Sequence, residues 1–578
     1  MDAVSDPEVE TVVVMSSSQV GKTESFINNA VGYFIHQDPS PMLVINPTLE
    51  MSRTWSKDRF APMLRDTPVL KGLVKEARSK DSDNTILHKS FPGGHITMAG
   101  ANSASSLAAR PVRALFLDEI DRFPESAGSE GDPVDLAIKR TTTFWNRKKL
   151  LTSTPTIKGA SRIEAAFAET DQRKYFVPCP QCDEYQVLDF KNLKWDKEQK
   201  TVPADRTLDK AIHKPETAHF VCQFCAGIIE ESDRKRMTIR GEWRATKPFT
   251  GAAGFWINEL YSPWVSWADF VKSFLTAKKF PETLKVFTNT SLAETWEEKG
   301  EGLEKAPLFD RREKYESQAP DEVLVITMSV DTQDDRLELE FKGWGIDEEV
   351  WGLGYHKIFG DPARVDVWNN LDNYINKTFR TASGVDLRVE CVAIDSGGHH
   401  TEMVYDFCKT KQRAGRMVYP IKGSSERGQP LVSSMSKKGK QNVNLFILGT
   451  DTGKSLISGR LQIEEPGPGY CHFPTTYDED YFKGLTAEHC VTRFIKGIAS
   501  RRWVLKQGHK RNEPLDLTVY NFAAFKILDP QLEILASKRG IEIKRANKEG
   551  DPAIPNKKAG PGRETKRPFL RTNKKRWI

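Results

Sequence analysis

The chain has 578 residues, of which 38% are hydrophobic and 28% are charged. This length exceeds what one hydrophobic core usually supports, so we expect two to four domains. The sequence has no apolar run long enough to span a membrane, and its acidic N-terminus is unlike a secretory signal, so we expect a cytosolic protein with no membrane partner.

Positive charge is concentrated near the C-terminus. Residues 538–578 contain 14 Lys or Arg against 4 Asp or Glu. The positive surplus of this segment is larger than the net charge of +6 for the whole chain, so the rest of the chain is mildly acidic. Because this segment is rich in Lys, Arg, Pro and Gly, we expect a flexible basic tail that neutralises nucleic-acid phosphates. A solvated tail without a specific partner is the alternative.

The first predicted unit is a strand, a tight loop and a helix. Residues 11–15 form a β-branched apolar run, and residues 16–23 (SSSQVGKT) match G-x-x-x-x-G-K-[ST] except that Ser16 replaces the first Gly. Free N–H groups at a helix N-terminus make such a loop an anion cradle. We therefore predict that Lys22 reaches the β- and γ-phosphates of ATP and that Thr23 holds Mg²⁺. The other predicted loop contacts are Ser16, Gln19 and Gly21.

Two acidic residues follow a later strand of the same unit. Short strands are expected at 42–46 and 95–99, and residues 114–117 form an apolar strand that ends in Asp118 and Glu119. This is the Walker B pattern, in which Asp118 holds the water shell of Mg²⁺ and Glu119 polarises the attacking water. Acidic turn residues are common after strands. Because Asp118 and Glu119 follow a phosphate-binding loop in the same α/β unit, however, we interpret them as residues of an ATP-hydrolysing site.

A further strand at 149–151 leads into Ser153 and Thr154. Hydroxyl groups at the end of a strand beside a nucleotide can bond the γ-phosphate or its water and thereby couple hydrolysis to movement. We include both residues in the predicted nucleotide site. An ordinary turn is the alternative.

Four of the eight cysteines form two C-x-x-C pairs, Cys179 with Cys182 and Cys222 with Cys225. In a cytosolic chain such pairs indicate a metal site rather than disulfides. Four thiolates suit tetrahedral Zn²⁺ and leave no open catalytic position, so we predict a structural zinc ribbon. A redox dithiol pair would require a thioredoxin-like surround, which the sequence does not suggest.

The region between 246 and 320 combines an aromatic-rich stretch with a charged stretch that begins at residue 298. The aromatic residues, which include Trp256 and Trp264, are expected to pack the zinc unit against the ATPase, with stacking on DNA bases as the alternative. The charged stretch resembles an interdomain linker.

A second α/β unit begins near residue 323. Asp331 follows its first strand, Asp395 follows a strand at 390–394, and Asp516 lies in the first turn of a helix at 515–528. Three acids from separate elements at one sheet edge would hold two Mg²⁺ or Mn²⁺ ions, which activate water and stabilise the leaving oxygen in a two-metal nuclease. Turn and cap roles for these acids are the alternative.

These motifs occur in the order of a known family. The chain resembles the large terminase subunit of tailed phages, in the lambda-like branch, through the segments TVVVMSSSQVGKTE, PVRALFLDEIDRFP, LLTSTPT, VPCPQC, FVCQFC, SVDTQDDRLELE, AIDSGG and RNEPLDLTVYNFAA. The resemblance implies an ATPase that translocates double-stranded DNA into a procapsid and an RNase H-like nuclease that cuts concatemeric DNA. It supports the roles above and adds Lys422, Gly423 and Asp451 as candidate DNA or metal contacts.

The resemblance also implies partners: a small terminase subunit, the portal protein of the procapsid and further copies of the chain in a ring. It places the protein in the host cytoplasm and transiently at the portal. Family members usually carry an upstream segment that contacts adenine and the small subunit. Only about ten residues precede the first strand here, so we expect a shortened start or a separate chain to account for it.

The expected organisation is an ASCE-type P-loop ATPase core at 1–170, a zinc-ribbon insertion at 171–245 and an aromatic subdomain with linker at 246–320. An RNase H-like nuclease at 321–537 and a basic tail at 538–578 complete it. The first alternative is a helicase-like, DNA-stimulated ATPase with a non-cleaving second domain. The second is a non-catalytic assembly protein, which the two carboxylates after Leu117 disfavour.

Overall fold

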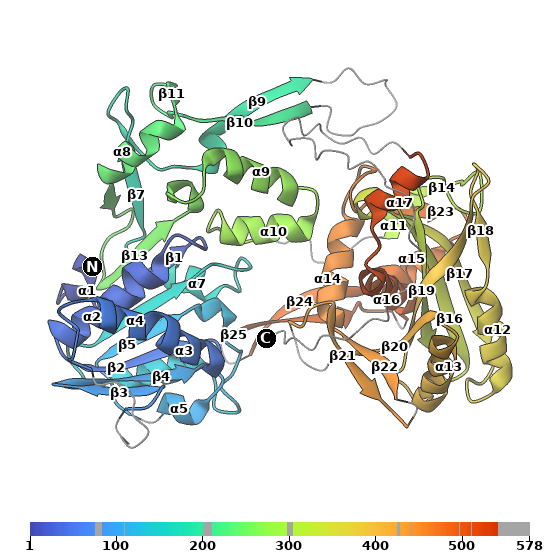
Figure 1. Ribbon diagram of the computed structural model, residues 1–578, viewed down its shortest axis with the longest axis horizontal. Helices are drawn as coiled ribbons and strands as arrows, with labels where there is room; N and C mark the ends of the chain where they lie inside the picture. The colour runs from blue at the N-terminus through green and yellow to red at the C-terminus, as the bar shows by residue number, and fades with distance from the viewer. Residues whose placement is uncertain are drawn as a thin grey trace, which may run out of the picture.

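Two α/β units make up the chain in the computed structural model (Figure 1). The structure describes residues 1–74, 84–108, 110–199, 211–297, 305–424, 428–440, 442–495, 498–509 and 511–541. The expected basic tail therefore lies almost entirely outside the described residues. Within the described residues, no helix combines the length and apolar character needed to cross a membrane.

The first unit is built on a mainly parallel sheet with the strand order β12-β7-β13-β1-β6-β5-β2-β4-β3, and β8 pairs with β7. Its strands are β1 (Thr11–Ser16), β2 (Pro41–Asn46), β3 (His88–Phe91), β4 (Gly94–Gly100), β5 (Ala114–Asp118), β6 (Lys148–Ser153), β7 (Arg173–Pro178), β8 (Tyr185–Gln186), β12 (Glu242–Arg244) and β13 (Ala252–Ile257). The strands expected from sequence at 11–15, 42–46, 95–99, 114–117 and 149–151 are all present.

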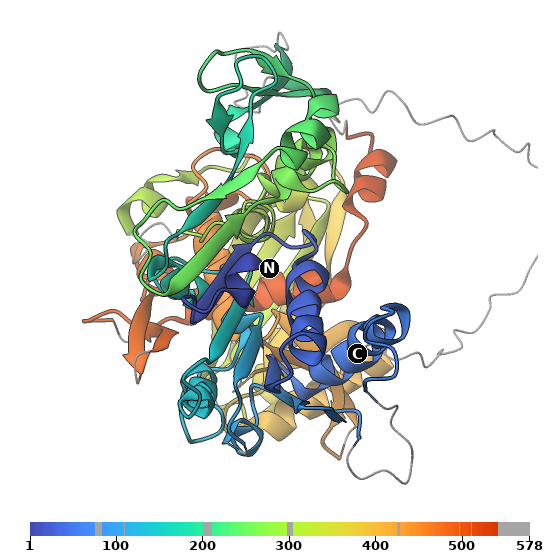
Figure 2. The same ribbon diagram turned by 90° about the vertical axis from the view of Figure 1, so that its left-hand side faces the viewer.

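Helices cover both faces of this sheet (Figures 1 and 2). They are α1 (Asp2–Ser5), α2 (Asn29–His36), α3 (Leu49–Trp55), α4 (Ala61–Asp66), α5 (Ala104–Ala108), α6 (Pro133–Ile138) and α7 (Arg162–Ala168), and a π-helical turn at Thr23–Asn28 precedes α2. On β5, Phe116 packs into one core cluster, whereas Leu115 and Leu117 pack into the other. Burial on both faces explains why the strand is a continuous apolar run.

A smaller region stands above this sheet in Figure 1. It contains the three-stranded sheet β11-β10-β9, formed by β9 (Leu193–Gln199), β10 (Ala211–Val221) and β11 (Ile228–Ile229), together with α8 (Arg234–Ile239), α9 (Trp267–Ala277) and α10 (Pro281–Thr290). Its core contains the aromatic residues Phe220, Trp267, Phe270 and Phe287. Much of the aromatic-rich stretch thus packs this region, although β13 at 252–257 lies in the first sheet beside β1.

The second unit has the strand order β14-β23-β17-β16-β15-β19-β20-β22-β21, with β18 paired to β19. Its strands are β14 (Arg312–Glu313), β15 (Val325–Thr332), β16 (Arg336–Trp344), β17 (Val350–Phe359), β18 (Thr378–Arg380), β19 (Asp386–Asp395), β20 (Met417–Gly423), β21 (Val432–Lys438), β22 (Val443–Leu448) and β23 (Cys471–Pro474), and a separate hairpin joins β24 (Glu488–Ile495) to β25 (Ile498–Leu505). β15, β16 and β17 are antiparallel, whereas β15, β19 and β20 are parallel.

The helices of the second unit are α11 (Lys305–Asp310), α12 (Val365–Ile375), α13 (Thr401–Arg413), α14 (Thr450–Leu461), α15 (Glu479–Leu485), α16 (Glu513–Leu528) and α17 (Leu532–Lys538). α12 and α13 pack into one core cluster and α14, α15 and α16 into another. The charged stretch expected as a linker contains α11 and β14, and β14 pairs with β23 of the second sheet. Residues 298–304 lie outside the described residues.

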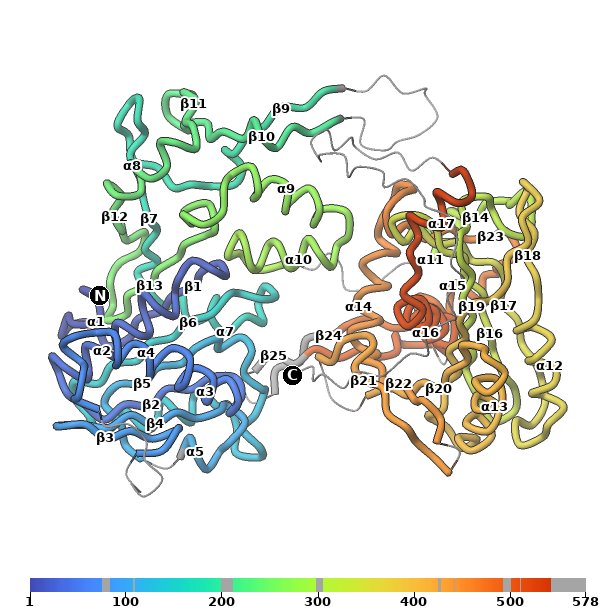
Figure 3. Tube along the Cα trace, in the orientation of Figure 1, coloured from blue at the N-terminus to red at the C-terminus, as the bar shows by residue number. Residues whose placement is uncertain are grey.

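The two units meet where α10 contacts α14 (Figures 1 and 3). Arg460 of α14 is buried there and its Nη2 lies 2.7 Å from Glu282 Oε1 on α10 and 2.6 Å from Glu348 Oε2. The guanidinium of Arg460 also lies over the aromatic rings of Phe280 and Phe522. One buried cation therefore holds acidic groups from both units.

Candidate active sites

The phosphate-binding loop and the Walker B acids lie at the same edge of the first sheet. β1, β6 and β5 are adjacent and parallel, so the residues that follow them emerge at one carboxyl edge. Lys22 and Glu119 form a largely buried ion pair across this edge. Arg122 Nε lies 3.6 Å from the second oxygen of Glu119.

The loop itself has the backbone of an anion cradle. Gly21 has φ +81°, in the left-handed region that glycine adopts without steric cost, and a helical turn begins at Thr23. Ser16, which replaces the usual first Gly, is fully buried, and its hydroxyl donates to the Ser17 carbonyl at 3.1 Å. A small side chain therefore fits at this position. Gln19 is exposed, with φ +57°.

The two Walker B acids have different surroundings. Asp118 is buried, and burial raises its pKa, while the Thr152 hydroxyl, which donates to Oδ1 at 2.5 Å, and the nearby Lys22 oppose that rise. Glu119 has φ +58° and ψ +49°, an uncommon conformation for a non-glycine residue that functional sites often impose. Thr154 Oγ1 lies 3.5 Å from Glu119 Oε2. Both acids are thus bonded to the end of β6.

Ser153 and Thr154 were both predicted to sense the nucleotide, and the structure separates them. Ser153 Oγ accepts from the Asp121 N–H at 3.3 Å and so braces the turn after β5. Thr152 on β6 and Thr154 just after it contact the two acids, and Ser153, the last residue of β6, lies between them. The period of two along a strand is the signal from which the role of Thr152 could have been recognised.

The three predicted nuclease acids come from three elements of the second unit, β15, β19 and α16, that are in contact with one another. Asp331 is near the end of β15 and Asp395 ends β19, and these parallel strands pair Val330 with Ile394. Burial raises the pKa of Asp331 to about 8, with further contributions from the charges of Asp395 and Asp516. Burial and the Asp516 charge likewise raise the pKa of Asp395 to about 6. Asp516 thus contributes to the raised pKa of both other acids, and charges act on a pKa in this way only over short distances.

Each acid is oriented by a different neighbour. Gln333 Nε2 donates to Asp331 Oδ2 at 2.7 Å, and the Gly397 N–H donates to Asp395 Oδ1 at 3.2 Å. Asn512 Nδ2 donates to Asp516 Oδ2 at 2.9 Å. These contacts engage one oxygen each of Asp331 and Asp395, whereas Asp516 Oδ1 is also engaged, by Lys454.

Two residues of this site were not predicted from sequence. Lys454 Nζ on α14 lies 3.1 Å from Asp516 Oδ1 and 2.7 Å from Glu488 Oε1 at the start of β24. No motif surrounds either residue, so only the fold reveals them. Of the candidates taken from the family resemblance, Lys422 is exposed but close enough to lower the pKa of Asp395, and Asp451 is exposed on α14.

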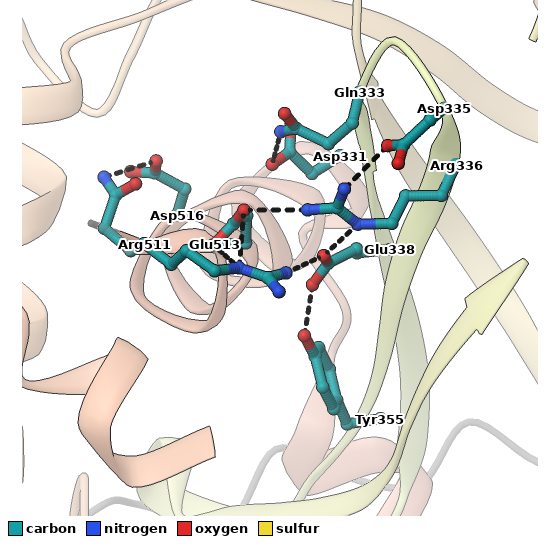
Figure 4. A network of polar contacts seen from close by, with 10 residues as sticks. Asp331, Gln333, Asp335, Arg336, Glu338, Tyr355, Arg511, Glu513 and Asp516 are labelled. Atoms are coloured by element: carbon teal, nitrogen blue, oxygen red, sulfur yellow. Dashed lines mark hydrogen bonds and ion pairs between the residues drawn. The ribbon is translucent and has the colours of Figure 1, made fainter. Parts of the chain in front are cut away.

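A charged network fixes the N-terminus of α16 against β16, as Figure 4 shows. Arg336 Nη2 lies 3.2 Å from Glu513 Oε1, and Arg336 Nε donates to Glu338 Oε1 at 2.6 Å. Arg511 bonds both Glu513 and Glu338, and the hydroxyl of Tyr355 donates to Glu338. Because Asp516 lies one turn after Glu513, this network also positions Asp516.

The four paired cysteines form a compact cluster. All four sulfur atoms lie within 4.8 Å of one another, and among the described residues no other group of three or more His, Cys, Asp or Glu side chains is this tight. The N–H groups of Gln181 and Phe224 each donate to the first sulfur of their pair at 3.4 Å. Asp183 and Ala226, which follow the two pairs, both have positive φ. The two turns therefore share one geometry.

Comparison with known proteins covers both units. A family model described as the ATPase domain of phage terminase large subunit gpA matches residues 1–243, and one described as the endonuclease domain of the same protein matches residues 252–536. The chain is 30% identical over 585 residues to the terminase large subunit of Enterobacteria phage P21, covering 94% of this chain and 88% of that protein. It is 30% identical over 554 residues to the Escherichia phage lambda terminase large subunit, covering 91% and 84%.

The solved structures that match are more distant. The HK97 bacteriophage large terminase shares 10% identity with a TM-score of 0.30, over 90% of this chain and 93% of that chain. A mutant ATPase domain of the Thermus phage P74-26 large terminase shares 13% identity with a TM-score of 0.29, over 50% and 90%. The family assignment therefore depends on the sequence matches.

Proposed function

This chain belongs to the gpA family of phage terminase large subunits, which package viral DNA with an ATPase and cut its concatemers with an endonuclease, and from that premise we propose which residues perform each step. The match of residues 252–536 to an endonuclease domain disfavours the helicase-like and non-catalytic alternatives.

We propose that Lys22 and Thr23 hold the phosphates and Mg²⁺ of ATP and that Glu119 orients the attacking water. The observation that carries this proposal is the ion pair between Lys22 and Glu119 at one sheet edge. A bound γ-phosphate would attract Lys22, which would free the carboxylate of Glu119 to accept a hydrogen bond from water. Asp118, which is bonded to Thr152, would hold the water shell of Mg²⁺, and that ion would supply positive charge to the phosphates.

In the second unit, Asp331, Asp395 and Asp516 are proposed to hold two divalent cations. Those ions would activate water and stabilise the leaving oxygen of the DNA strand. The supporting observation is that β15, β19 and α16 pack together, so that the charge of Asp516 adds to burial in raising the pKa values of both Asp331 and Asp395. The strand order β17-β16-β15-β19-β20, three antiparallel strands followed by two parallel ones, supports an RNase H-like nuclease.

The cysteine cluster is proposed as a structural zinc ribbon. Two knuckles of equal geometry bring four sulfur atoms together, which fits tetrahedral Zn²⁺ and leaves no open position for a substrate. Double-stranded DNA, the small terminase subunit, the portal protein and other copies of the chain are the proposed partners, on the family relationship alone.

A plasmid assay tests the nuclease assignment. Supercoiled plasmid is incubated with Mn²⁺ and the wild type, Asp331→Asn, Asp395→Asn or the control Asp334→Asn. Asp334 lies in the same hairpin but its side chain is 77% exposed and pairs with His399. We expect loss of cleavage in the first two variants only. Cleavage that persists in both variants would exclude Asp331 and Asp395 from the nuclease site. The Lys22→Ala variant should lose ATP hydrolysis but still cut the plasmid.

A further inference from the structure

Trp264 lies against the phosphate-binding loop although its side chain is 70% exposed. A Cβ placed on Gly21 would stand 3.2 Å from Cη2 and 3.7 Å from Cζ3 of the indole. The six-membered edge of the ring therefore contacts the glycine next to Lys22. An exposed tryptophan at this position is unusual, because large aromatic side chains are mostly buried.

The position of Trp264 follows from the order of strands in the first sheet. β13 pairs in parallel with β1, with Ile257 opposite Ser16. The chain that follows Ile257 therefore emerges at the same edge as the phosphate-binding loop. The Ser17 N–H donates to the Ile257 carbonyl at 3.0 Å, which joins the two segments directly.

The segment that carries Trp264 is fixed at its β13 end and at the start of α9. Asn258 is buried and its side chain accepts from the Leu260 N–H at 3.1 Å and donates to the Leu188 carbonyl at 2.9 Å. Ser266 caps α9 by accepting from the Asp269 N–H at 3.0 Å. The segment is thus held rigidly while its central indole remains exposed.

The region of the cysteine cluster also holds this segment. Arg234 Nη1 donates to the Val265 carbonyl at 2.7 Å, and the Trp267 N–H donates to Glu231 Oε2 at 2.7 Å. Arg234 and Glu231 are themselves paired at 2.7 Å. Val265 and Trp267, which follow Trp264, are therefore anchored to residues that come after the second cysteine pair.

We propose that Trp264 stacks on the base of the nucleotide whose phosphates occupy residues 16–23. This inference rests on the nucleotide site proposed above. The phosphates are held by the loop, so the base must lie beside the loop, where the indole offers a rigid and exposed aromatic face. Because every base has a π-face, the contact adds affinity for the nucleoside end without strict choice of base.

Steady-state ATP hydrolysis by the full chain, without DNA, tests the proposal. We expect Trp264→Ala to raise KM for ATP about 3- to 10-fold with little change in kcat, and Trp264→Phe to restore most of the affinity. Inhibition by inorganic tripolyphosphate, which has no base, should be the same for Trp264→Ala and wild type.

Trp145→Ala is the matched control. Trp145 is 90% exposed, but it precedes β6 and so lies at the opposite edge of the sheet. An unchanged KM in Trp264→Ala, with hydrolysis lost in Lys22→Ala, would overturn the stacking proposal and leave the nucleotide site standing. Hydrolysis that survives Lys22→Ala would overturn the nucleotide site itself. Weaker DNA binding by Trp264→Ala with an unchanged KM would assign the indole to DNA and overturn the proposal.

Discussion

Replacing Asp331 with Asn is predicted to stabilise the metal-free protein while abolishing DNA cleavage. Burial and two neighbouring acids raise the pKa of Asp331 from 3.8 to about 8. A carboxyl group with a raised folded-state pKa opposes folding as the pH rises from the unfolded value toward the folded one. The ionised form is thus disfavoured between about pH 4 and pH 8, and the neutral amide removes that cost.

The magnitude follows from the size of the shift. At pH 7 the pH lies about three units above the unfolded-state pKa of Asp331. At 1.36 kcal/mol per unit, ionising Asp331 in the folded protein therefore costs at most about 4 kcal/mol. Part of the shift comes from the charges of Asp395 and Asp516, and Lys454 offsets the charge of Asp516, so we expect about 2 kcal/mol of observable stabilisation. The gain should disappear near pH 4, where the wild-type carboxyl is also neutral.

Thermal melting of wild type and Asp331→Asn in EDTA, from about pH 4 to pH 8, measures this effect. Mg²⁺ or Mn²⁺ should then raise the melting temperature of the wild type more than that of the variant, since the cations neutralise the acidic cluster. Asp334→Asn should follow the wild type throughout. A variant less stable than wild type at every pH, or equal stabilisation of both by Mg²⁺, would refute the convergence of the acids on a cation site.

Three further predictions concern other parts of the chain. Glu119→Gln should retain ATP binding but lower kcat about 10²- to 10⁴-fold in phosphate-release assays; hydrolysis at the wild-type rate would assign the water-orienting role elsewhere. Arg460→Met should lower the free energy of unfolding by about 3 kcal/mol in urea titrations, because Glu282 and Glu348 lose their buried partner. Unchanged stability would show that these three charged residues do not hold the two units together. Cys182→Ser should lower the zinc content measured by mass spectrometry and the melting temperature; wild-type protein free of zinc at full stability would exclude a structural metal.

The phosphate-binding loop, the Walker B strand and the cysteine pairs were recognisable in the sequence because each is local. A β-branched run, a loop of fixed length and a helix with apolar residues at 3.6-residue spacing are determined by near neighbours. The structure has β1 and the turn at Thr23 at these positions. Asp331 was expected just after the first strand of the second unit, but β15 extends through Thr332 and so includes it.

Residues that act through contacts distant in sequence could not be recognised in this way. Lys454 and Glu488 join Asp516 only because α14, β24 and α16 pack together. Trp264 was expected to serve packing, yet the pairing of β13 with β1 leaves it beside Gly21. The role of Thr152 depended on which face of β6 meets Asp118.

The sequence by itself determined the local elements, their order and the chemical type of each candidate site, because these depend on residues within one turn or one strand. Tertiary structure alone decided which side chains meet, since strand order and helix packing set distances that no spacing along the chain encodes. The charges of Asp395 and Asp516 raise the pKa of Asp331 across a sheet and a helix, although 185 positions of sequence separate Asp331 from Asp516. Their raised pKa values are therefore a property of the fold rather than of any motif.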